Sequence, residues 1–465
     1  MKNKSLHIVT ALLATLLGAI TPQKANAQDL LSAYFIDNYT YSYRINPAFQ
    51  TKKNFAGALI STIHSGTNSN VGLSTFIYPY QDKLANFMHP SVSSEKFLGK
   101  LHKINRISID VHHNIASVGF WSKYKGEEIF QTYEINWKNN TSAKIPYQVF
   151  KFLKGGSGED FFYDLSNVRA FTRSYLEFAG GVSKREGKLS WGARGKFLLG
   201  MHKIDGHIKQ MYADLNGLSW SMNSSATITA AGGGIKKSTR PSAKGEFEAL
   251  NFNSLKFKPI GLGGAGAAID IGLKYEINPY INLSLSANDL GVIFWKDKVT
   301  GKNDHTMWVF EGIDNIDNIG DIGHIVNDII ANFKGIYEFK EAKNRITGQT
   351  LATTINGGIG FRMPFYNKLT VGILGSVKFR KVNPYQEVRL SLNATPLKWL
   401  SASINTAYST YGWEVGGMIN ICAKKFNLFM GTDSYYYNMN KQFIPINEFN
   451  TQVVFGVNYL FGTEH

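Results

Sequence analysis

The sequence predicts an all-β protein, a closed antiparallel transmembrane β-barrel of about 14 strands, with 12 or 16 as the alternatives. An N-terminal plug segment and short loop helices complete the prediction. Three observations lead to it. Apolar and polar residues alternate over segments of about ten residues, the length that crosses a bilayer when tilted. The polar positions are rich in Gly, Ser, Asn, Lys and Asp, as expected of a wet lumen. Tyr and Trp cluster near the segment ends, as in interfacial girdles.

The composition narrows the alternatives. The 465 residues include one cysteine, and 43% are hydrophobic and 18% charged. A single cysteine excludes a disulfide scaffold and any cysteine-based metal framework, and this apolar fraction excludes a disordered chain. A mean hydropathy of −0.17, with no long apolar run after the N-terminus, excludes a helical membrane bundle. A soluble, exported all-β protein remains the alternative, because a sandwich alternates as well.

Residues 1–27 have the anatomy of a secretory signal. Lys2 and Lys4 give a basic start, an apolar segment follows, and Ala25-Asn26-Ala27 fits an A-x-A cleavage site. A transmembrane anchor is the alternative, but the apolar run is too short for one. We therefore predict cleavage of this segment and export. The signal alone leaves soluble export, the periplasm and the outer membrane open, and the predicted barrel favours the outer membrane.

Residues 28–54 precede the predicted barrel, which covers 55–465. The stretch 39–49 holds three tyrosines within five residues and Pro47, without a clean period. A flexible leader is one interpretation. Exposed aromatic runs are uncommon, so we expect residues 28–54 to fold into the lumen as a plug.

The clearest alternation runs from Ala265 to Ile277, where every odd position is apolar or aromatic. A second alternating segment starts at Ile281, directly after Asn278-Pro279. We predict a β-hairpin closed by this tight turn. More alternating segments occur than a 14-stranded wall needs, so some are expected to be soluble extensions.

The final segment is predicted to be the lipid-facing C-terminal strand and the signal for the barrel-assembly machinery. Its outward stripe consists of Val453, Phe455, Val457, Tyr459 and Phe461. Gln452, Gly456 and Asn458 should then face the lumen, where substitutions are expected to be mild.

Two helices are predicted outside the strands. One covers residues 146–154. In the other, apolar residues recur at helical spacing from Ile322 to Phe333, which gives one apolar face. We expect this second helix to cap the barrel mouth or fold inward.

No motif indicates catalysis. Residues 261–266 fit G-x-G-x-x-G, but a strand follows them where a dinucleotide site needs a helix. We interpret these glycines as room for close packing or for a bend at the barrel wall. His112 and His113 point to opposite faces of a strand and cannot chelate one ion. We predict no enzyme, with no catalytic residues, cofactor or metal.

The formal charge of +16 raises the question of nucleic acid. An exported barrel meets lipopolysaccharide phosphates instead. The charge therefore predicts outer-membrane lipid and lipopolysaccharide as partners, without nucleic acid.

A plug latch is predicted around Asp270 and Asp289. Both lie on the polar parity of the predicted hairpin, and pairing about Pro279 sets them opposite one another. Two opposed carboxylates repel, so we predict a partner between them, with Arg44 and Asn46 of the plug as candidates. Two separately hydrated lumen acids are the alternative.

Two stretches resemble a known family. Residues 264–295 and the element Asn46-Pro47-Ala48 are similar to a family of Bacteroidota outer-membrane barrel proteins of unknown function, itself distantly similar to the FadL-type fatty acid and hydrocarbon transporters. This resemblance implies a 14-stranded barrel with an N-terminal plug. In FadL-type proteins the ligand is hydrophobic and leaves laterally through the wall. The Asn-Pro-Ala element also occurs in barrels of the type IX secretion and gliding machinery.

Two functions follow from these expectations. The first is passive uptake or binding of a small hydrophobic or amphipathic molecule at the outer membrane. The second is a structural or adaptor barrel that docks secretion or cell-surface proteins, which the long loops favour. A continuous apolar path past the plug would favour the first, and a closed lumen without an apolar pocket the second.

Overall fold

The computed structural model describes residues 30–59, 62–81, 83–155, 161–216, 219–242, 245–256, 258, 261–310, 338–343, 346–436 and 449–462. The predicted signal segment 1–27 and the predicted helix within 322–333 lie outside these residues. In the described part, no helix has the length and apolar character to cross a bilayer.

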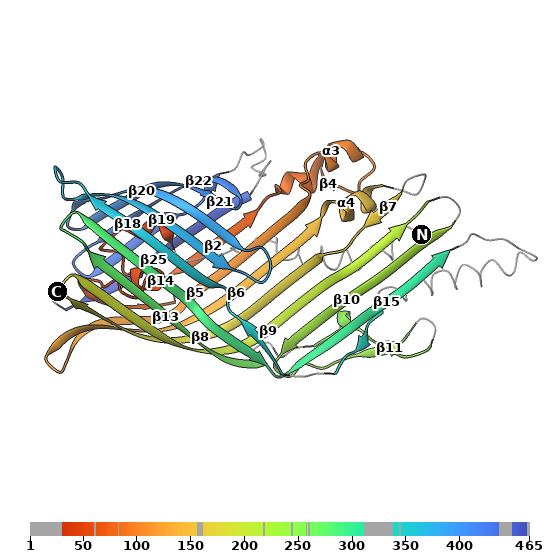
Figure 1. Ribbon diagram of the computed structural model, residues 1–465, viewed down its shortest axis with the longest axis horizontal. Coiled ribbons are helices and arrows are strands. Elements are labelled where there is room, and N and C mark those ends of the chain that lie inside the picture. The colour runs from red at the N-terminus through yellow and green to blue at the C-terminus, as the bar shows by residue number, and fades with distance from the viewer. Residues whose placement is uncertain are drawn as a thin grey trace, which may run out of the picture.

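Fourteen antiparallel strands form a closed wall, as the sequence predicts. The last strand pairs with the first two strand segments of the chain, which share one position in the wall. The remaining wall strands follow in chain order, joined mostly by short turns at one end of the barrel (Figure 1). In order around the barrel they are β1 (Asn54–Ala58) with β2 (Ile63–Ser69), β5 (Ile104–Tyr124), β6 (Glu127–Pro146), β8 (Val168–Glu186), β9 (Leu189–Asp214), β13 (Gly264–Glu276), β14 (Ile281–Trp295), β18 (Thr353–Arg362), β19 (Leu369–Phe379), β20 (Tyr385–Leu397), β21 (Leu400–Ser409), β22 (Gly412–Cys422), β23 (Phe426–Thr432) and β25 (Phe449–Phe461).

The wall forks along β9. The first half of this 26-residue strand pairs with β13, and the second half pairs with β10 (Trp220–Gly232). At the fork, a Cβ on Gly233 or Gly261 would overlap the backbone of the other residue, so the two crossing segments need glycine there. Gly261 opens the G-x-G-x-x-G stretch, which therefore serves close backbone packing, as predicted.

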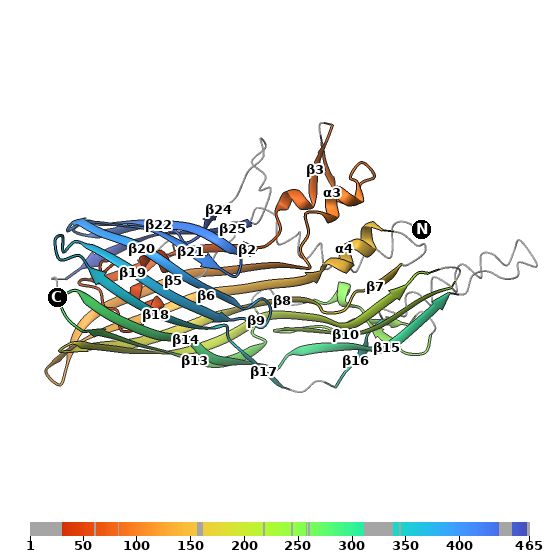
Figure 2. The same ribbon diagram turned by 45° about the horizontal axis from the view of Figure 1, so that its top comes forward.

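A half-cylinder extends the barrel beyond this fork. It consists of the far ends of β5, β6, β8 and β9, continued by β10 and β15 (Lys298–Phe310), and it projects past the shorter strands β18 to β22 (Figures 1 and 2). The predicted short helix is present as α4 (Tyr147–Lys154) and packs at the end of this extension.

The remaining elements are short and belong to the plug or to the connections between wall strands. They are η1 (Leu31–Ala33), α2 (Ser42–Ile45), η2 (Leu73–Thr75), β3 (Ile77–Tyr80), β4 (Lys83–Asn86), α3 (Ser94–Leu98), β7 (Phe162–Asp164), β11 (Thr239–Pro241), β12 (Glu248–Leu250), η3 (Phe252–Ser254), β16 (Lys340–Glu341), β17 (Thr347–Thr350) and β24 (Tyr435–Tyr436). Two apolar clusters lie outside the barrel, one centred on Tyr163 and Trp308 and the other on Phe97 and Phe150.

The C-terminal strand β25 separates its two faces sharply. On one face, Val453, Phe455, Tyr459 and Phe461 are exposed and Val457 is half-buried. On the other face, Gln452, Gly456 and Asn458 are buried, and so is Val454, which packs against the plug. Asn458 accepts a hydrogen bond from the plug residue Tyr41, with 2.6 Å between the oxygens. A substitution at Asn458 is therefore expected to act on the plug, because the plug fills the lumen there.

Val457→Lys and Asn458→Ala should separate the two faces of β25. A lysine on the outward stripe should lower barrel stability by about 2–4 kcal/mol at mid-membrane depth, because the charge meets lipid. Asn458→Ala should leave barrel assembly unchanged and loosen only the plug. Heat-modifiable gel migration and protease digestion of the N-terminal segment measure the two effects. Equal loss of assembly in both variants would contradict this assignment of faces.

Candidate functional site

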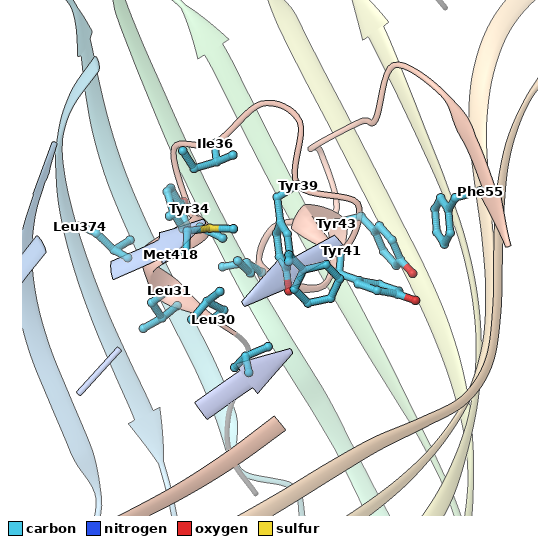
Figure 3. Packing of buried hydrophobic residues seen from close by; sticks show 14 of the residues in the cluster. Leu30, Leu31, Tyr34, Ile36, Tyr39, Tyr41, Tyr43, Phe55, Leu374 and Met418 are labelled. Atoms are coloured by element: carbon cyan, nitrogen blue, oxygen red, sulfur yellow. The ribbon is translucent and has the colours of Figure 1, made fainter. Parts of the chain in front are cut away.

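The N-terminal segment 30–49 lies inside the barrel and forms a plug. Its apolar side chains are buried in one cluster with residues from the wall (Figure 3). The wall residues of this cluster come from strands on several sides of the lumen, so the segment is enclosed. They are Phe55, Phe130, Leu374, Met418, Phe429, Val454 and Leu460.

A buried aspartate holds the start of the plug. The backbone N–H groups of Leu31 and Ser32 donate to the two carboxylate oxygens of Asp433 at 2.6 and 2.5 Å. The Asp433 side chain is itself approached by Arg389 at 3.9 Å. A carboxylate that accepts backbone N–H groups in this way fixes the position of the chain, because charge-assisted hydrogen bonds are short and strong.

Three tyrosines led to the prediction that this segment folds into the lumen, and their side chains are packed there (Figure 3). Tyr39 and Tyr41 meet Phe429 edge-on, and Tyr43 stacks on Phe55. The Tyr43 hydroxyl donates to Glu134 of β6. Burial, together with the charge of Glu134, raises the pKa of Tyr43, so this hydroxyl stays protonated and remains a donor.

Glu134 is the centre of an ion network between plug and wall. Arg44 of the plug contacts Glu134 at 2.8 Å, and Arg194 of β9 contacts the same carboxylate at 2.9 Å. Arg194 also pairs with Asp270 at 3.0 Å. The side chains of Arg44 and Glu134 are only 2% and 1% exposed, so each charge depends on the others for compensation.

The predicted latch residues are connected, but by a different route. Lys196 of β9 lies between the two aspartates, 2.8 Å from Asp270 and 2.5 Å from Asp289. The predicted placement of Arg44 or Asn46 between them is therefore wrong. Arg44 reaches Asp270 through Glu134 and Arg194, because two strands of the wall supply the compensating charges.

The predicted face-to-face pairing of Asp270 and Asp289 is also wrong. The register from Gly264↔Trp295 to Ile269↔Leu290 follows the expected hairpin, but a β-bulge shifts it before Ile271↔Ala287. Asp289 lies in this bulge with a φ of 58°, in the left-handed region. Its backbone N–H donates to the Asp270 carboxylate at 2.7 Å, which removes part of the expected repulsion.

Asn46 binds the wall with its side-chain amide, which contacts backbone carbonyl groups of two strands. Its side-chain amide lies 3.2 Å from the carbonyl of Leu273 and 3.3 Å from that of Leu285, on the two strands of the β13–β14 hairpin. The plug can approach so closely because Gly192 and Gly272 face it. A Cβ on Gly192 would overlap Pro47, and one on Gly272 would overlap Asn46. The Asn-Pro element is thus the docking point of the plug on a glycine-lined wall.

A small pocket of about 60 Å³ lies against the plug on the side of the half-cylinder. Leu31 and Ile45 of the plug contribute to its lining, together with charged wall residues such as Asp289. Its other lining residues are Asp110, Val111, His112, Lys138, Asn140, Tyr175, Asn288, Ala352, Thr354, Asn356 and Lys378. The pocket is therefore mixed in polarity, with the ion network on one side and the plug on another.

Replacing both predicted latch acids, in the variant Asp270→Asn with Asp289→Asn, should leave Lys196 with Glu177, at 3.8 Å, as its remaining carboxylate partner among the described residues. We expect lower thermal stability of the barrel in detergent, because an undercompensated buried cation is costly. Protease cleavage of the plug should rise less than after loss of Glu134, which touches the plug directly. Cleavage at the wild-type rate with unchanged stability would show that these acids have no structural role.

The chain is similar in shape to several solved barrels. The toluene transporter TodX of Pseudomonas putida is 11% identical, with a TM-score of 0.40, and the match covers 94% of this chain and 95% of that one. The toluene transporter TbuX of Ralstonia pickettii is 8% identical, with a TM-score of 0.40 over 92% and 95%. A FadL homologue of Pseudomonas aeruginosa is 8% identical, with a TM-score of 0.39 over 90% and 93%. No curated protein matches the chain.

A family model matches most of the chain. The match covers residues 47–433, from the Asn-Pro-Ala element to the aspartate that holds the start of the plug. The chain therefore belongs to the family of unknown function DUF5723.

Proposed function

We propose that this protein is an outer-membrane barrel that binds a small molecule at its mouth and admits it past the N-terminal plug, without catalysing a reaction. The observation that carries the proposal is the position of the pocket. Plug residues Leu31 and Ile45 form part of its lining, so a ligand in the pocket touches the segment that blocks the lumen. Binding can then bias the position of the plug, provided that the ligand interacts differently with its two positions.

The lining favours an amphipathic molecule over a purely hydrophobic one. Val111, Tyr175 and Ala352 offer apolar contacts, while Lys138 and Asp110 offer charge. Exposed apolar side chains on the outer face of the wall, such as Ile373 and Leu390, would meet membrane lipid. Lipopolysaccharide and the barrel-assembly machinery are the corresponding proposed partners.

Mass spectrometry of small molecules that co-purify with the detergent-solubilised protein tests this proposal. We expect an amphipathic compound in the wild type. Its amount should fall in the variant Ile45→Lys, which places a charge in the pocket lining, and should not change in Ile373→Val on the outer face. Equal amounts of the same compound in all three proteins would contradict binding in this pocket.

A second function is favoured by the half-cylinder. The extension has two apolar clusters of its own, which a simple pore would not need. An adaptor barrel would use this extension to dock a secreted or cell-surface protein. Removal of the segment that carries β3, β4 and α3 would abolish docking in that case, and would leave small-molecule binding unchanged under the first proposal.

A further inference from the structure

The inner face of the half-cylinder carries an excess of positive charge. Three successive rows of side chains cross β5, β6, β8, β9, β10 and β15 in register on this face. The first row is Asp110, Asn140, Arg173, Lys203, Ala231 and Lys298; the second is Ser108, Ser142, Phe171, Asp205, Thr229 and Thr300; the third is Arg106, Lys144, Arg169, His207, Thr227 and Lys302. Seven Lys or Arg residues thus stand against two aspartates.

Both aspartates are already compensated by other cations. Lys378 contacts Asp110 at 3.0 Å, and Arg380 contacts the same carboxylate. Lys381 and Arg169 contact Asp205, the latter at 3.7 Å. Three of these cations lie outside the rows, at the end of β19 and in the segment after it: Lys378, Arg380 and Lys381. Arg169 is one of the seven cations of the rows. The three additional cations outnumber the two aspartates, so they raise the net positive charge around the rows.

Three cations of the first row are buried and form no direct ion pair with a carboxylate among the described residues. Arg173, Lys203 and Lys298 are 3%, 5% and 9% exposed. Arg173 donates to the carbonyl of Thr350 and to Asn140, and its Nε has no hydrogen-bond partner in the described part of the chain. Within the described part of the chain, the hydrogen-bond partner of Lys298 is the Thr347 hydroxyl, at 3.2 Å. Buried cations that lack a direct ion pair are costly, so a site that keeps three of them is suited to a ligand that brings a paired negative charge.

We infer that this face is a binding site for a small solute carrying two or more anionic groups, of the phosphate or carboxylate type. Neighbouring strands are about 5 Å apart, so adjacent cations of one row suit two anionic groups on one small molecule. Arg173 supplies a planar fork of donors and Lys203 a point charge. Asn140 and Lys378 belong both to this surface and to the lining of the pocket at the plug. The inference rests on the proposed function and extends it, because it names the chemical class of the molecule that binds at the barrel mouth. It does not require that this molecule pass through the barrel.

Isothermal titration of the full-length protein in detergent with inorganic pyrophosphate tests the inference. Acetate serves as the single-charge probe and glucose as the neutral one. We expect pyrophosphate to bind more tightly than acetate, with weaker binding as salt rises. Lys203→Gln and Arg173→Gln should each weaken binding about tenfold or more, since hydrogen bonds to charged groups are lost. Lys203→Arg should retain it.

Lys188→Gln is the matched control, because it removes the same charge beside the other end of β9. Heat-modifiable migration verifies that each variant is folded, and removal of a cation that lacks a direct ion pair should not destabilise the barrel. Pyrophosphate binding that is equal in Lys203→Gln and Lys188→Gln would overturn the inference. So would binding of purified lipopolysaccharide alone, with none of pyrophosphate, because the phosphates would then come from the membrane. Failure of passage through the barrel would refute the proposed function and leave this binding intact.

Discussion

Replacing Glu134 with Gln is expected to release the plug from the wall. Arg44 and Arg194 both pair with this carboxylate, and the Tyr43 hydroxyl donates to it. Loss of its charge leaves two buried guanidinium groups undercompensated, which costs about 3–5 kcal/mol for a broken buried pair. We expect the N-terminal segment to become sensitive to added protease at least about tenfold faster, because its closed position loses that stabilisation.

Glu127→Gln is the matched control for this experiment. Glu127 lies on the same strand and pairs with Lys184 at 2.6 Å, but its side chain is 62% exposed. A surface pair of this kind contributes about 0–1 kcal/mol, so its loss should leave the plug protected. The double variant Arg44→Gln with Glu134→Gln completes a double-mutant cycle for the pair. Wild-type protection of the plug in Glu134→Gln would show that the ion network does not hold it.

Deletion of residues 30–49 should open the barrel. The plug contributes the aromatic residues at the centre of the lumen cluster, and the wall around it carries polar side chains such as Asn356 and Asn420 that would then meet water. A 14-stranded wall without its filling leaves an aqueous channel, as in wide barrels. Liposomes containing the deletion variant should swell in arabinose at least about tenfold faster than liposomes containing the wild type.

The deletion should also lower the melting temperature, since a buried apolar cluster is lost. Heat-modifiable migration must persist, which separates an open barrel from an unfolded one. Swelling at the wild-type rate by a correctly assembled deletion variant would contradict the view that the plug closes the lumen.

The wall could be predicted from the sequence because its determinants are local. Period-two alternation and strand length identify β13, β14 and β25 directly, and the Asn-Pro turn between β13 and β14 is present at the predicted place. The length of β5 is harder to predict, because a bulge between Asn114 and Ala116 interrupts its alternation and makes it resemble two shorter strands. In β9, the register against β8 shifts between Gly200 and His202, so the alternation breaks there although the strand continues.

The site could be predicted only in part, because it depends on the register between distant strands. Arg44, Asn46, Asp270 and Asp289 lie at or near the contact of plug and wall, but Glu134 and Lys196 complete it. The sequence prediction included neither Glu134 nor Lys196. The alternation in β9 does place Lys196 on the inward face of its strand. Val454 and Leu460 are a clearer indication of the plug, because they are apolar residues on the inward face of β25. Apolar side chains that point into a lumen predict that a segment of the protein packs against them.

Movement of the plug during passage is the central claim, and a reversible crosslink tests it most directly. The Thr40 hydroxyl of the plug donates to Asn427 of β23 at 2.7 Å. Cysteines at these two positions, with Cys422 replaced by Ser, can be joined by a short reducible bis-thiol reagent. Vesicles loaded with serum albumin then report the arrival of anilinonaphthalene sulfonate, an amphipathic anion, by its fluorescence. The account predicts that the crosslinked barrel admits no more dye than empty vesicles and that reduction restores uptake. Equal dye uptake by the crosslinked and the reduced barrel would contradict it.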